Sequence, residues 1–162
     1  MDFDKQIHLY KNKHTLFGVC SAIIFIVGFV LRKFEILDNP IIYNPIGAMI
    51  LMYVGMIFTP LLIVWGYSKF DKIAKVAKAD ISDPEEKKSL YLSIKFFQNK
   101  LIYIILFFNA LVYLLTFKDQ FSMLYSISVI VFFMNYPTKH CYIRNFEHDD
   151  FDDHYESDLK KE

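Results

Sequence analysis

The sequence predicts an all-α fold: an integral membrane bundle of four transmembrane helices, with a cytosolic helical hairpin that extends spans two and three. Hydrophobic residues make up 54% of the 162-residue chain, above the roughly 45–50% usual for soluble domains. They gather in four uncharged runs, residues 15–31, 41–67, 101–117 and 121–136. A helix needs about 20 apolar residues to cross the hydrocarbon core, so these runs favour spans over the buried helices of a soluble protein.

The positions of Lys and Arg predict which side of the membrane each helix end faces. Fifteen of the 18 basic residues lie in residues 1–14, 68–100 and 137–162, and the other three lie in the two short loops. Basic residues are concentrated on the cytoplasmic side of membrane spans. We therefore expect both termini in the cytosol and the protein in a cytoplasmic membrane of the bacterial type.

The first predicted span, residues 15–32, is an uncleaved helix. Arg and Lys follow its apolar run, where a signal peptide would have a small-residue cleavage site. Gly18 and Ala22 form a small-xxx-small pair, and Gly47 and Gly55 lie eight residues apart in the next run. Small residues let helix backbones approach closely, so this pattern predicts that spans one and two pack together.

The second predicted span, residues 44–67, begins with a clear start signal. Asn44 suits the N-cap and Pro45 suits the first helical position. Pro60 is expected to kink this helix, because its ring removes a backbone N–H and clashes with the preceding turn.

Residues 68–99 carry two apolar stripes at helical spacing, separated by a second helix start at Asp83, which a Pro and two Glu follow. We expect a cytosolic helical hairpin that turns at residues 79–83. Either the stripes pack on each other and complete the hairpin, or they form an exposed surface for a partner or for anionic lipid. The candidate partner-contact residues are Phe70, Ile73, Ile81, Leu90, Ile94 and Phe97.

The third and fourth predicted spans, residues 100–117 and 120–137, complete a membrane domain over residues 1–136. The predicted spans contain no ionisable residue in their apolar runs, which is atypical of pumps and transporters. The notable intramembrane polar residues are Asn109 and Thr59. We interpret Asn109 as a hydrogen-bonding contact between helices, although both side chains would line the pore if an oligomer formed a channel.

Residues 137–162 form the predicted cytosolic acidic tail, which contains the near-palindrome HDDFDDH. Its candidate metal ligands are His148, Asp150, Asp152 and His154. A strand would place alternate ligands about 6.6 Å apart, and a helix would direct the two i, i+4 pairs differently. The stretch also lacks the Gly and the final Glu of an EF-hand loop. A solvated tail is therefore favoured over a metal site.

The function is predicted mainly from what the sequence lacks. It has no HExxH, P-loop, GxSxG or CxxC pattern, so we expect no enzymatic activity, no cofactor and no nucleic-acid partner. Membrane lipid and a protein partner, or further copies of the chain, are the expected partners. The first hypothesis is a small accessory or immunity-type subunit that binds another membrane protein.

Two alternatives remain open at the level of sequence. One is a homo-oligomeric channel or small transporter subunit. The other is a lipid-modifying membrane enzyme that uses His140 and Arg144 at the inner surface of the membrane.

Overall fold

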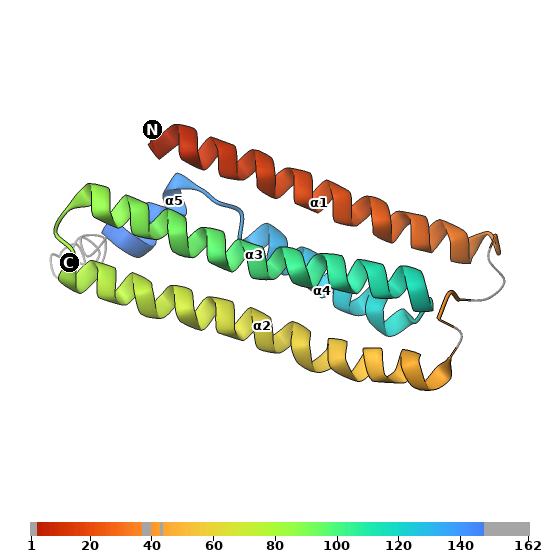
Figure 1. Ribbon diagram of the computed structural model, residues 1–162. Coiled ribbons are helices and arrows are strands. Elements are labelled where there is room, and N and C mark those ends of the chain that lie inside the picture. Colours follow the sequence, from red (N-terminus) through yellow and green to blue (C-terminus); the bar gives the residue numbers. More distant parts are fainter. Residues whose placement is uncertain (1–2, 37–39, 43, 148–162) are drawn as a thin grey trace, which may run out of the picture.

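The computed structural model describes residues 3–36, 40–42 and 44–147. These residues form long helices joined by short connections (Figure 1). In chain order the helices are α1 (Phe3–Lys33), α2 (Pro45–Asp80), α3 (Pro84–Thr116), α4 (Asp119–Met134), α5 (Lys139–Tyr142) and the π-helical turn η1 (Ile143–Glu147). The all-α prediction is confirmed.

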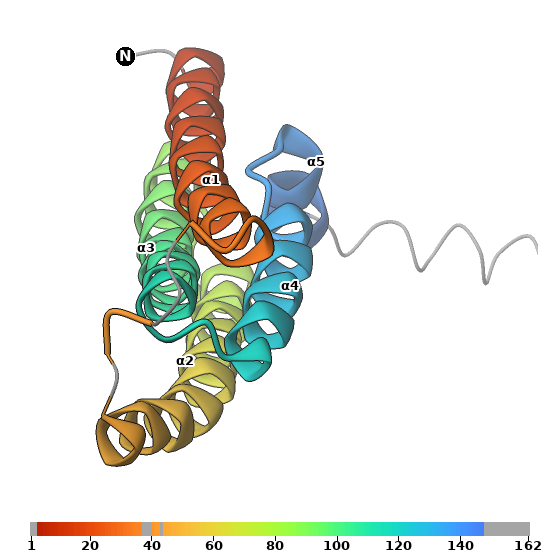
Figure 2. The ribbon, with the colours of Figure 1, turned by 90° about the vertical axis from the view of Figure 1, so that its right-hand side faces the viewer.

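Helix α3 is the central element, because it packs against α1, α2 and α4. Figures 1 and 2 show α1 and α2 on opposite sides of the α3–α4 pair. The predicted close packing of spans one and two is therefore wrong. A Cβ added to Gly18 would lie 2.7 Å from the ring of Phe132 in α4, and one added to Gly55 would lie 2.7 Å from the ring of Phe121. Gly18 therefore allows α1 to approach α4 closely, and Gly55 allows α2 to do so.

Three helices, α1, α2 and α3, are long and apolar enough to cross a membrane, which is consistent with a membrane location. Helix α4 has 16 residues, and at a rise of 1.5 Å per residue it is about 24 Å long. It reaches the required length only together with the helical segment that follows, and the two are bent by 80°.

Both predicted helix starts are confirmed. The side chain of Asn44 accepts a hydrogen bond from the Ile46 N–H at 3.0 Å, and that of Asp83 accepts one from the Glu85 N–H at 3.1 Å. Each cap precedes a Pro at the first helical position. The connection between α2 and α3 is only residues 81–83, within the turn predicted at residues 79–83.

The start of α1, the turn between α2 and α3, and α5 lie at the same end of the molecule, which we call the charged end (left in Figure 1). An aromatic and aliphatic core fills it, with Ile7, Phe70, Tyr91, Tyr142 and Phe146 buried. Helix α1 begins well before the predicted span, so residues 3–14 extend it into this core.

Candidate functional site

The candidate partner-contact residues of the hairpin lie in the interior of the charged end. Phe70 and Ile94 are buried, with 8% and 4% of their surface exposed. Four others are partly buried and pack against the same core: Ile73, Ile81, Leu90 and Phe97. The two stripes therefore pack on each other and on α5, as the simpler of the two readings had it.

A buried lysine lies next to this core. Lys95 in α3 is 5% exposed, and its Nζ donates hydrogen bonds to Gln98 Oε1 at 3.0 Å and Asn135 Oδ1 at 3.3 Å. The ammonium also lies 5.2 Å from the centre of the Phe70 ring. Burial lowers the pKa of Lys95 below its usual range, because the charged form loses its water.

Asn135 connects this lysine to two further helices. It is the C-terminal cap residue of α4, and its Nδ2 donates to Val131 O at 2.9 Å and to the hydroxyl of Tyr67 in α2. The ammonium of Lys95 thus lies at a helix C-terminus, whose partial negative charge favours a cation. The network joins α2, α3 and α4 at one level of the bundle.

His14 forms a second junction, between α1, α3 and α4. It is fully buried, one residue before the predicted first span. Its Nε2 donates to Phe132 O at 3.0 Å and its Nδ1 lies 2.9 Å from the Tyr103 hydroxyl, so the neutral ring accepts from that tyrosine. Burial lowers the pKa of His14 to about 4.

The sequence contained a signal for both buried residues. His14 continues the stripe of Phe3, Ile7 and Tyr10 at helical spacing, and Lys95 lies four residues after the buried Tyr91. The positive charge of Lys95 indicates only the side of the membrane on which it lies, whereas the position of each residue on an apolar helical stripe indicates burial.

The two predicted intramembrane polar residues meet in the structure. Asn109 Nδ2 donates to Thr59 Oγ1 at 3.3 Å and to Ser128 Oγ at 3.0 Å, which links α3 to α2 and α4. Asn109 is fully buried and Thr59 is 2% exposed. Each polar group is satisfied by another inside the fold, so the arrangement holds helices together in apolar surroundings.

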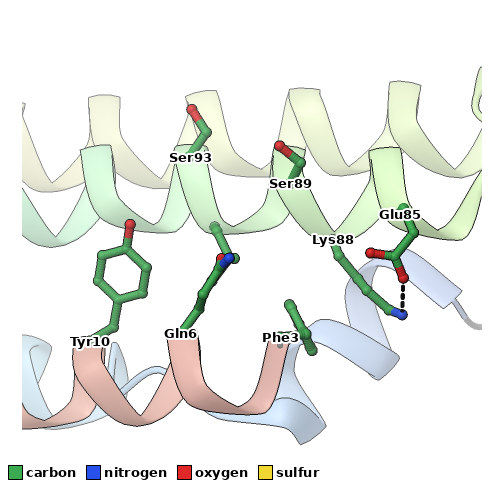
Figure 3. A pocket seen from close by; sticks show the side chains of 8 residues that line it. Phe3, Gln6, Tyr10, Glu85, Lys88, Ser89 and Ser93 are labelled. Carbon is green, nitrogen blue, oxygen red and sulfur yellow. Dashed lines mark hydrogen bonds and ion pairs between the residues drawn. The ribbon is translucent and has the colours of Figure 1, made fainter. Parts of the chain in front are cut away.

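Among the grooves on the surface of the described residues, two lie beside α1. A polar groove of about 310 Å³ lies between the starts of α1 and α3. Figure 3 shows Gln6 and Tyr10 of α1 pointing towards α3, which contributes Ser89 and Ser93 to the groove, beside the 2.7 Å ion pair of Lys88 with Glu85. An apolar groove of about 270 Å³ lies between α1 and α4, and its floor includes Leu106 of α3.

Other predicted site residues are not brought together. The candidate metal ligands His148, Asp150, Asp152 and His154 lie outside the described residues, and residues 3–147 contain no group of three metal-ligating side chains where they are described. His140 and Arg144 are both exposed, on α5 and η1.

The packing and the hydrogen bonds described above are therefore the basis for a functional proposal. Comparisons with protein-family models, with curated proteins and with solved structures found no match.

Proposed function

We propose that the protein is a small, non-enzymatic integral membrane protein that acts by binding a partner membrane protein. The observation that carries this proposal is the closed polar interior. Asn109 bonds with Thr59 and Ser128, His14 uses both ring nitrogens within the fold, and Lys95 is tied to two amides. Side chains used in this way hold the helices together and leave the outer surface for function.

In the proposed arrangement four helices cross the membrane, α4 together with the bent segment after it, and the charged end lies in the cytosol. The basic residues of the α1 start, the α2–α3 hairpin and α5 gather at this end, where they favour the cytoplasmic side. A reporter fused after Glu162 is expected to be active only inside the cell. A reporter active outside the cell would overturn this orientation.

The outer face of α2 is the proposed partner surface, in place of the hairpin stripes. It exposes Met49, Tyr53 and Met56 by 45–57%, beside aliphatic residues such as Ile50 and Ile57. Methionine and aromatic residues are enriched at protein interfaces, and methionine adapts its shape to different surfaces. The exposed face of α1 contains no methionine and is mainly aliphatic: Leu16, Val19, Ile23, Ile26 and Val27.

Site-specific photocrosslinking in the native membrane tests this proposal. A photoreactive residue replaces Ile57 on α2, which is 64% exposed, or Ile26 on α1, which is 56% exposed and serves as the matched control. We expect Ile57 to give an adduct with one defined second protein, and Ile26 to give none. Native mass spectrometry after extraction in mild detergent identifies the partner.

If the crosslinks joined only copies of this chain, they would instead support a homo-oligomeric channel. Ion flux through the protein in liposomes would then be measured. The present geometry gives that reading less support, because Asn109 and Thr59 face each other within one chain. The lipid-modifying alternative also receives less support, because His140 and Arg144 are both exposed and the described residues contain no group of three side chains that could hold a metal ion.

A further inference from the structure

The apolar groove between α1 and α4 has the form of a site for one hydrocarbon chain. Val19 of α1 and Phe133 of α4 stand at its rims, 51% and 67% exposed, and the buried Leu106 of α3 lies at its floor. Along α1 it runs from Thr15 to Ala22, a rise of about 10.5 Å at 1.5 Å per residue.

The shape of the groove suits a flexible apolar occupant. It follows α1 for about 10.5 Å, its lining is almost entirely apolar, and it is open to the surface along its length. A single extended hydrocarbon chain can lie along such a groove.

The inner wall of the groove is fixed before any ligand binds. The ring of Phe132 stacks on His14 with their centroids 3.8 Å apart and their planes 7° apart. Gly18 allows this ring to approach α1, since a Cβ there would lie 2.7 Å from it. A wall held in this way costs little ordering entropy when a chain enters.

The end of the groove nearer the charged end has a cation beside it. Thr15 and Tyr136 line it, and Lys11, one helical turn before Thr15, places its ammonium 6.0 Å from the centre of the Tyr136 ring. The groove is thus apolar along its length and positive at one mouth, a complement to an amphiphile with an anionic head.

We propose that this groove binds one acyl chain of an anionic glycerophospholipid, whose phosphate pairs with Lys11. Thr15 lines the groove one helical turn after Lys11, and its hydroxyl can donate a hydrogen bond to an ester carbonyl of that lipid. The inference rests on the proposed membrane placement and is independent of the partner protein.

Native mass spectrometry of the full chain in mild detergent tests the site. The probes are phosphatidylglycerol and phosphatidylcholine with identical acyl chains, which differ only in head-group charge. We expect one lipid per chain, with phosphatidylglycerol bound about fivefold more tightly, the contribution of one lysine near a membrane surface. Lys11→Gln is expected to abolish this preference, and Lys13→Gln, on the same helix, to retain it.

A second pair of variants tests the groove itself. Ala22→Phe fills it and is expected to lower the binding of both lipids at least fivefold, whereas Ile26→Phe, outside the groove on α1, leaves binding unchanged. If Ala22→Phe alters the far-UV circular dichroism, Val19→Trp repeats the test from the exposed rim.

Equal affinity for the two lipids, or binding that survives both filling variants, would overturn the proposal. A photoreactive residue at Val19 that captures a polypeptide instead of lipid would overturn it as well. A protein that fails to bind lipid but passes the reporter test keeps its membrane placement, so the two failures are distinguishable.

Discussion

Two glycines of α2 allow the packing of the bundle to be tested with one type of substitution. A Cβ at Gly55 would lie 2.7 Å from the ring of Phe121 and 3.4 Å from that of Phe108. Carbon atoms attract best at about 3.5–4.0 Å, so the Phe121 ring has to move by about 0.8 Å. That ring is fully buried, and overpacking of this kind costs about 1–3 kcal/mol.

Gly47 is the matched control, because a Cβ there would meet no atom closer than 3.8 Å. Alanine is favoured over glycine in a helix by up to about 1 kcal/mol. We expect Gly47→Ala to stabilise the fold by about 0.5 kcal/mol and Gly55→Ala to destabilise it by about 1–2 kcal/mol.

Unfolding in mixed micelles of mild detergent and sodium dodecyl sulphate, followed by far-UV circular dichroism, measures both changes. Equal shifts of the two midpoints in the same direction would refute the close approach of α2 to Phe121.

Three further outcomes are expected in the same unfolding assay. Asn109→Ala leaves Thr59 and Ser128 without their shared partner and lowers stability by about 1 kcal/mol; an unchanged midpoint would argue against the three-helix junction. Stability falls as the pH drops from about 6.5 to about 4, because the lowered pKa of His14 means that the unfolded chain takes up the proton first. After allowance for solvent screening the loss is about 1–2 kcal/mol, and it disappears in His14→Gln. Asp83→Ala removes the N-cap of α3 at a cost of about 1 kcal/mol, whereas Asp80→Ala, which carries no cap, leaves the midpoint in place.

The sequence predicted the helices themselves well, since length, apolar content and start signals are local properties. The caps at Asn44 and Asp83 depend only on a side chain and the next two residues, and both form as expected. The end of α4 was misjudged at residue 137. Pro137 disfavours helical backbone at the residue before it, and the helix ends earlier, at Met134.

The neighbours of each helix could not be predicted in the same way. Gly18 and Gly55 signal close approach, but a spacing along one helix does not specify which helix approaches, and both face aromatic rings of α4. The partners of Lys95 and His14 could not be predicted for a related reason. These partners, Asn135 and Phe132, lie more than 30 residues away, and a helical stripe that indicates burial does not specify them.

The shortness of α4 has a consequence for the surrounding bilayer under the proposed membrane placement. At about 24 Å it falls short of a hydrocarbon core of about 30 Å. The uncharged runs of α1 and α3, residues 15–31 and 101–117, are hardly longer, at about 26 Å each. Lipid beside these helices has to compress to match them. Such hydrophobic mismatch costs a fraction of a kcal/mol for each ångström, and it favours thinner membranes for this protein.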